Sequence, residues 1–441
     1  MFKRIFVGMV ILVFFAGLGF LVYSWRPAIE PIDPPLASSF PSELVERGRM
    51  LSGAGNCAVC HTVEGGGDYA GGRAIRSDFG TIYSTNITPD PDTGIGRWSE
   101  RAFFRAMREG LRRDGAHLFP AFPFDHFTRL NGADLSALYA YLMSRPPVKA
   151  TRPDNTLPFP LNVRLLQAGW KLLFFDEGAL EPQPDKGEAW NRGAYFAEGL
   201  AHCGACHSPR NALGAERSGK KRYAGAIIDG WYAPALTQVN ASPLPWTRDE
   251  LFDFLRTGAT GLHGVAGGPM SEVVHRGLAQ LSDADIHALA VYFAELAKAP
   301  SRISDDEIMA AMMVQAASAR SAEDEEGARL YASTCVACHY NRPGAPLAER
   351  PEMALNSAVT GPDPATFIRI VAQGVGTTDG HPAAYMHGYA RALKDREIVA
   401  IAAYLRRAYV APTARMEQGA GAWQDLEAQV LEALRREEVV E

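Results

Sequence analysis

Six cysteines constrain this chain more than any other feature, because they fall into three motifs of one spacing. The motifs are CAVCH at 57–61, CGACH at 203–207 and CVACH at 335–339, and no cysteine lies outside them. Two thiols one helical turn apart can form thioether bonds to the two vinyl groups of one haem, and the adjacent histidine then reaches the iron. A redox dithiol or half of a zinc site would explain one such match better than three. The sequence therefore predicts three covalent haem c groups, held by Cys57, Cys60, His61, Cys203, Cys206, His207, Cys335, Cys338 and His339.

Residues 1–30 predict a membrane anchor. Lys3 and Arg4 precede an uncharged stretch from Ile5 to Trp25, which is long enough to cross a hydrocarbon core as a helix. The two basic residues place its start in the cytoplasm. A cleaved signal peptide is the alternative, although its apolar region would be shorter and a small-residue cleavage site would follow directly. In both cases the rest of the chain lies outside the bacterial cytoplasmic membrane, in the periplasm.

The composition, and the motifs that the sequence lacks, exclude several classes of function. Hydrophobic residues make up 47% of the 441 positions, which is ample for packed cores. The formal charge is −6 and no basic block is present, so nucleic acid is excluded as a partner. The chain carries no dinucleotide fingerprint, phosphate loop, hydrolase elbow or zinc-protease motif. The chemistry that remains is one-electron transfer.

A second repeat accompanies the haem motifs. Downstream of each motif, one apolar face at helical spacing recurs in DLSALYAYL (134–142), DIHALAVYF (285–293) and EIVAIAAYL (397–405). Upstream, a glycine-containing helical approach recurs in RGRMLSGAGN, NRGAYFAEGLAH and EEGARLYAST. Each unit is therefore predicted to contain a helix, a haem motif, a loop region and a closing helix.

With this order of elements, each unit resembles a class I cytochrome c domain, in which two helices cross and the haem sits in a loop-lined crevice. STNITPDPDTGIGRWSE at 84–100 and NRGAYFAEGLAHCGACHSPRNALGAE at 191–216 extend the likeness beyond the motifs, over roughly residues 40–410. The resemblance implies a mainly α fold, with three tandem class I cytochrome c domains behind an N-terminal transmembrane helix. The expected order is 1–30 cytoplasmic start and anchor, 40–148 domain 1, 149–186 linker with an apolar helix, 187–300 domain 2, 301–322 linker, 323–411 domain 3 and 412–441 C-terminal tail helix.

Three such domains behind an anchor resemble the cytochrome c subunit of periplasmic membrane-bound dehydrogenases. That family implies a tri-haem subunit passing electrons from a catalytic dehydrogenase subunit, of molybdenum hydroxylase, flavin or PQQ type, to ubiquinone or a terminal oxidase. The AFPFDHF wording at 121–127 resembles most the cytochromes that accompany molybdenum hydroxylases of aldehydes or N-heterocycles. Two alternatives stay open: a haem enzyme, such as a peroxidase or small-molecule reductase, with an open first iron, or a free-standing periplasmic carrier. An oxidase or quinol-oxidising subunit would need more transmembrane sequence or an integral partner.

The family pattern places a methionine on the far side of the iron, in the loop before the closing helix. Met270, in GGPMSE, and Met386, in AAYMHGY, occupy that place in the second and third units, although a core role is the alternative for any methionine. Nearby His263, His275, His381 and His387 are expected to have surface or hydrogen-bonding roles.

In the first unit Phe122, within PAFPFDHF, occupies the methionine position, and a phenyl ring cannot ligate iron. Met107 and Met143 fall on helical runs and are expected in the core. His126 is the favoured sixth ligand, with His117 or an open iron as alternatives. A second imidazole lowers the potential that a thioether raises, so the first haem is expected to have the lowest potential.

Two further expectations concern the surroundings. The family's proximal histidine donates to a nearby proline carbonyl, which Pro209 and Pro343 match, whereas Thr62-Val63-Glu64 in the first unit offers none. The apolar stretch at 161–175 is expected to pack on its own domains, or else to dock a catalytic subunit or lie near membrane quinone.

Overall fold

A computed structural model describes residues 2–304, 306–307, 326–339, 353–376 and 386–410, with the single positions 423, 426, 428 and 430. The chain divides into two compact units. Unit 1 comprises Met1–Glu181 together with Glu198–His202, and unit 2 comprises Pro182–Ala197 and Cys203–Glu441. The third haem motif and the closing helix that follows it therefore belong to unit 2.

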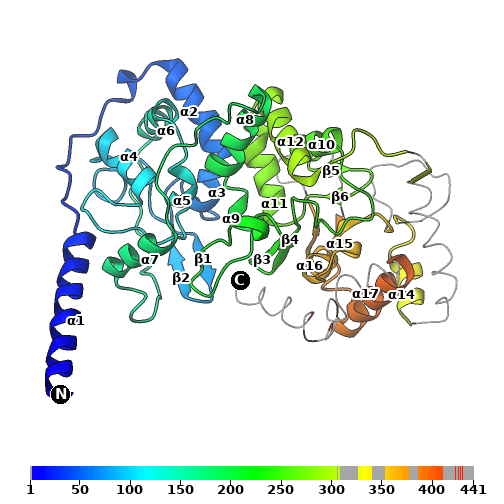
Figure 1. Cartoon of the computed structure of the whole chain (residues 1–441). Coiled ribbons are helices and arrows are strands. Elements are labelled where there is room, and N and C mark those ends of the chain that lie inside the picture. The colour runs from blue at the N-terminus through cyan, green and yellow to red at the C-terminus, as the bar shows by residue number, and fades with distance from the viewer. Residues whose placement is uncertain are drawn as a thin grey trace. The chain divides into compact units, whose positions relative to one another are not determined.

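Unit 1 is helical, with one small antiparallel hairpin (Figure 1). Its elements are α1 (Phe2–Ser24), η1 (Ala37–Ser39), α2 (Ser42–Ala54), α3 (Cys57–His61), β1 (Ala74–Ser77), β2 (Gly80–Tyr83), α4 (Glu100–Glu109), α5 (Phe124–Phe127), α6 (Gly132–Met143), η2 (Arg164–Leu166) and α7 (Gln167–Phe174). Among the described helices, only α1 is long and apolar enough to cross a membrane, and the residues of its most apolar stretch are not buried. A signal sequence near the N-terminus would satisfy the same criterion.

Unit 2 repeats this kind of architecture. Its elements, with η3 shared between the units, are α8 (Glu188–Tyr195), η3 (Phe196–Leu200), α9 (Gly204–His207), η4 (Gly219–Lys221), β3 (Ala226–Ile228), β4 (Trp231–Ala233), α10 (Arg248–Thr257), β5 (Ala259–Thr260), β6 (Gly264–Val265), α11 (Pro269–Glu272), η5 (Val273–Gly277), η6 (Leu278–Gln280), α12 (Asp283–Ala297), α14 (Glu326–Thr334), α15 (Ser357–Thr360), α16 (Ala365–Gln373), β7 (Gly374–Val375), β8 (Met386–His387) and α17 (Asp395–Tyr409). The hairpins pair β3 with β4, β5 with β6, and β7 with β8, all antiparallel. The three closing helices predicted from periodicity are confirmed as α6, α12 and α17.

One helix crossing recurs three times in the described part of the chain, between α2 and α6, α8 and α12, and α14 and α17. A glycine of the first helix meets a backbone carbonyl of the second. A Cβ atom added at Gly48, Gly193 or Gly327 would lie 2.0, 2.0 or 2.1 Å from that oxygen. The carbonyls belong to Ala137, Ala288 and Ala400, and Tyr141, Tyr292 and Tyr404 lie one turn further on. The glycine and the Ala-x-x-x-Tyr pattern of each repeat thus form one close backbone contact, which no larger side chain permits.

An ion pair beside the crossing is present in the first two repeats. Arg47 bonds to the buried carboxylate of Asp134 (Nε–Oδ1 2.7 Å), and Arg192 bonds to Asp285 (2.8 Å). Both aspartates lie in the first turn of the closing helix, where a carboxylate is favoured by the helix dipole. The third repeat has Glu326 and Glu397 at these positions, so an acid replaces the arginine.

The apolar helix of the 149–186 segment is α7, and it packs on unit 1 as expected. The predicted tail helix at 412–441 lies outside the described residues except at four positions, of which 426, 428 and 430 are helical. The predicted 301–322 linker also lies largely outside the described residues.

Candidate haem sites

Each C-x-x-C-H motif forms a helical turn, so both thiols and the histidine lie close to one another. CAVCH is α3 itself. In the second motif the His207 amide donates to the Cys203 carbonyl (3.0 Å), and in the third the His339 amide donates to the Cys335 carbonyl (2.8 Å). All six cysteines are free thiols, so no disulfide competes for them.

Burial raises the pKa of the first thiol in each motif, to about 11 for Cys57 and Cys335 and about 12 for Cys203. A redox dithiol instead needs a thiolate, and hence a lowered pKa. A thioether carries no charge, so apolar surroundings suit it. The donor set therefore fits covalent haem better than thiol redox chemistry.

The first two proximal histidines are oriented by backbone carbonyls. His61 Nδ1 donates to Thr85 O and His207 Nδ1 donates to Pro234 O, and the N–O distance is 2.6 Å in both cases. Since a carbonyl only accepts, Nε2 carries the lone pair that an iron requires. Burial lowers the pKa of both histidines, against the opposing effect of these hydrogen bonds, and this favours the neutral, ligating form.

The expectation that Pro209 would orient His207 is therefore wrong, because the acceptor is Pro234, further along the chain. In the first unit the expected lack of a proline is correct, and a threonine carbonyl takes its place. Pro343, the candidate acceptor for His339, lies outside the described residues.

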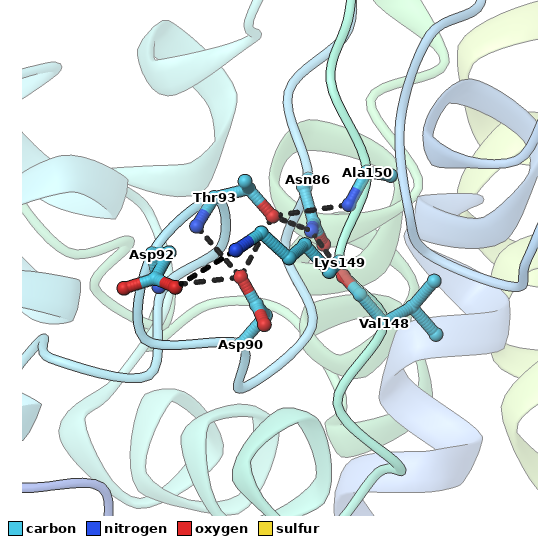
Figure 2. A network of polar contacts seen from close by, with 7 residues as sticks. All are labelled: Asn86, Asp90, Asp92, Thr93, Val148, Lys149 and Ala150. Carbon is cyan, nitrogen blue, oxygen red and sulfur yellow. Dashed lines mark hydrogen bonds and ion pairs between the residues drawn. The ribbon is translucent and has the colours of Figure 1, made fainter.

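A polar network holds the loop that carries the Thr85 carbonyl (Figure 2). The buried Asn86 amide donates to Thr93 Oγ1 (2.9 Å) and to Val148 O (2.7 Å). Asp90 Oδ1 accepts from the Thr93 amide and hydroxyl, both at 2.7 Å. Hydrogen bonds thus join the loop within itself and to the segment that follows α6, and this holds the carbonyl that accepts from His61 in place. Sequence reasoning missed this role, although the Asn, Asp and Thr side chains are typical of such local turns.

The predicted methionine ligands both lie in short elements of unit 2, Met386 in β8 and Met270 in α11. Met386 packs against the apolar core of α14 and α17, in the same group of contacts as Cys335 and Val336. Met270 is the second residue of α11, and Gly268, just before this helix, has a positive φ of 51° and lies with its backbone against the Trp231 ring. Trp231 belongs to β4, and Pro234 directly follows this strand, so one segment contacts the turn before Met270 and supplies the acceptor of His207.

In unit 1 the structure distinguishes the two candidate histidines. His126, in α5, is 4% exposed, and its Nδ1 donates to Glu198 O (2.8 Å). As in the proximal histidines, Nδ1 is the donor, so Nε2 is the nitrogen that would ligate an iron. His117 is equally buried, but its Nε2 donates to Ser24 O (2.8 Å). His117 therefore ties the end of α1 to unit 1 and holds the wrong tautomer for Nε2 ligation.

Other predicted roles are borne out in part. Met107 and Met143 are buried in the core. His263 has the expected hydrogen-bonding role, although it is buried rather than on the surface: Nδ1 contacts Ser242 Oγ (2.9 Å) and its ring stacks on Trp246. His387 is exposed, and His381 lies outside the described residues.

Comparison with known proteins agrees with this geometry. A family model described as cytochrome c matches residues 45–146, and one described as cytochrome c oxidase, cbb3-type, subunit III matches residues 322–405. A nicotinate dehydrogenase subunit of Pseudomonas putida is 47% identical over 90% of this chain, which spans only 33% of that relative's length.

Two other relatives are matched along most of both chains. The fructose dehydrogenase cytochrome subunit of Gluconobacter japonicus is 37% identical, over 85% of this chain and 81% of its own length. The gluconate 2-dehydrogenase cytochrome c subunit of Pantoea cypripedii is 36% identical, over 90% of this chain and 91% of its own length. Cytochrome c domains imply covalent haem c and electron transfer. Since these relatives match along most of both chains, the chain belongs to the family of cytochrome c subunits of dehydrogenases.

Proposed function

We propose that the chain is a tri-haem electron-transfer subunit, with a class I cytochrome c domain around each motif. The observation that carries this proposal is the glycine–carbonyl crossing, which recurs once with each C-x-x-C-H motif. The family models cover the first and third of these units, and the second has the same crossing, motif and oriented histidine. The haem supplies the redox chemistry, and the chain sets its orientation and its surroundings.

The haem count is tested by intact mass and by the pyridine haemochrome spectrum of the purified chain. Three haems per chain are expected, and two in a variant with Cys203→Ala and Cys206→Ala. Two haems in the unaltered chain, with no change in that variant, would contradict a haem at the second motif.

In the first domain His126 is the proposed sixth ligand. It is buried, lies in α5 just before the closing helix and holds the tautomer that ligation requires. Met270 and Met386 are the proposed sixth ligands in the other two domains. Because a second imidazole favours ferric iron relative to a thioether, the first haem should have the lowest midpoint potential.

Variants of the two histidines test this assignment. His126→Ala should convert one haem to a high-spin form that binds cyanide readily, and His126→Met should raise one of the three midpoint potentials. His117→Ala is the matched control, since His117 is as buried, and should leave all three haems low-spin. A high-spin haem already present in the unaltered chain would instead favour a haem enzyme, a peroxidase or small-molecule reductase, at an open first iron.

The catalytic partner is proposed to be a dehydrogenase of N-heterocycles. The relative with 47% identity is named as a nicotinate dehydrogenase subunit, whereas the fructose, gluconate and alcohol dehydrogenase subunits are 32–37% identical. Electrons from such a partner would pass through the three haems to ubiquinone or a terminal oxidase. The α1 helix is proposed as an uncleaved inner-membrane anchor that leaves the haem domains in the periplasm.

The partner is identified by purifying the complex from native membranes through this chain and determining its other cofactors. Molybdenum with iron–sulfur clusters is the expected content. Flavin or pyrroloquinoline quinone would indicate a sugar or alcohol dehydrogenase instead, and purification without a second subunit would favour a free-standing carrier.

A further inference from the structure

Helix α7 buries its one charged residue and leaves two leucines exposed. Its inward face contains a charged residue, since Lys171 is buried beside Ala168. Its outward face consists of Leu172 and Leu173, which are 66% and 67% exposed, and Leu166 and Phe159 just before it are 43% and 81% exposed. A soluble surface helix shows the opposite arrangement, with charged residues outward and leucines inward. The outward face of α7 is therefore an exposed apolar surface.

The contacts that hold α7 on unit 1 explain why this face stays outward. Lys171 Nζ donates to the carbonyls of Glu109 and Gly110, at the C-terminal end of α4, where the helix dipole favours a cation. The Phe124 ring packs edge-on against Trp170 and Phe175, with centroids 6.0 and 5.1 Å apart. Rotating α7 to bury its leucines would break all of these contacts.

Helix α7 also contacts α1, the proposed membrane anchor. A Cβ atom on Gly169 would lie 3.6 Å from the Phe20 ring, near the C-terminal end of α1, and Figure 1 shows α7 beside that end of α1. The end of α1 and the residues after it are held on the rest of unit 1, since His117 bonds to Ser24 O and Arg105 bonds to Pro27 O (2.7 Å). The end of the anchor and α7 are thus held together by the same domain.

We propose that α7, with Phe159 and Leu166, is an interfacial helix that inserts its leucines into the surface of the phospholipid bilayer. This inference rests on the proposed role of α1 as an anchor. The occupant is lipid because Gly169, three residues before Leu172, lies against Phe20 of α1, close to where the apolar span ends, which places the leucines of α7 near the membrane boundary if α1 is the anchor. An interfacial helix buries its apolar side at the boundary between headgroups and acyl chains, as these leucines would do. The first haem domain is then held at a fixed distance and orientation above the membrane.

Photolabelling of the full haem-loaded chain in phospholipid nanodiscs tests the inference. The bilayer carries a phospholipid with a diazirine in its acyl chain, and labelled peptides are mapped by mass spectrometry. Labels are expected in α1 and at Leu172 and Leu173. Leu213 and Val239, which are 55% and 66% exposed in unit 2, serve as matched controls for exposed apolar side chains outside α7. Their labelling is expected to be at least ten-fold weaker than that of α7.

A double variant, Leu172→Asn with Leu173→Asn, should lower labelling at Phe159 several-fold and leave labelling of α1 unchanged. Labelling of α1 without α7 overturns the interfacial helix and leaves the anchor intact. Absence of labels on α1 overturns the anchor and this inference with it. Labels on α7 that are lost only when the co-purified catalytic subunit is present would show that α7 is a protein interface, and would also overturn it.

Discussion

Gly193→Ala tests whether the helix crossing is the contact that defines each domain. The added Cβ would lie 2.0 Å from Ala288 O and 2.8 Å from the Tyr292 Cβ. A backbone oxygen cannot rotate away, so α8 and α12 must separate by roughly 1 Å, a gap that forfeits about a quarter to a half of each contact energy. Overpacking of this kind costs about 3 kcal/mol at the upper end, and the better helix propensity of alanine returns about 1 kcal/mol. The expected net destabilisation is therefore about 2 kcal/mol.

Hydrogen exchange followed by mass spectrometry measures this locally in the full chain. A loss of about 2 kcal/mol should speed exchange of the α8 and α12 peptides roughly 30-fold, with the α2 and α6 peptides unchanged. Gly132→Ala, at the start of α6, is the control, because its nearest neighbour would be 3.9 Å away. That change should be neutral or stabilise by up to about 1 kcal/mol. If Gly193→Ala exchanges as slowly as the unaltered chain, the crossing does not depend on glycine and the reasoning fails.

Three further changes test individual contacts. Asn86→Ala should loosen the loop that carries the acceptor of His61, and should shift the midpoint potential of one haem without changing the haem content. Asp92, in the same loop, forms only an exposed ion pair, so Asp92→Ala should leave all midpoint potentials unchanged. Glu326→Arg should supply the ion pair that the third repeat lacks and stabilise α14 and α17 by up to about 1 kcal/mol in denaturant unfolding, whereas a loss of stability would refute the equivalence of the repeats. Burial lowers the pKa of Lys171 from 10.5 to about 7. Between about pH 7 and 10.5 the unfolded chain therefore keeps a proton on Lys171 that the folded chain has lost, so the free energy of unfolding should rise with pH in that window. In Lys171→Met this rise, at most about 1.4 kcal/mol per pH unit, should disappear; an unchanged pH dependence would contradict it.

The helices and the haem motifs were predictable because both depend on local spacing. Apolar residues at helical intervals gave α6, α12 and α17, and C-x-x-C-H places its donors within one turn whatever the rest of the chain does. The glycine of each first helix was visible in the sequence as well. Its partner was not, because the carbonyl that it meets lies about 70–95 residues further on and belongs to the backbone, which carries no side-chain signal.

The sequence by itself determined where the C-x-x-C-H motifs lie and which helices accompany each motif, since these follow from residues close to one another along the chain. The tertiary structure decided the orientation of the donors. Thr85 and Pro234 were chosen as acceptors by the path of the loops, 24 and 27 residues beyond their histidines, and not by proline content near the motif. It likewise separated His126 from His117, because the nitrogen that donates depends on which carbonyl the fold brings beside each ring. Composition alone marked α7 as apolar, but only packing against α4 showed that its lysine points inward and its leucines outward.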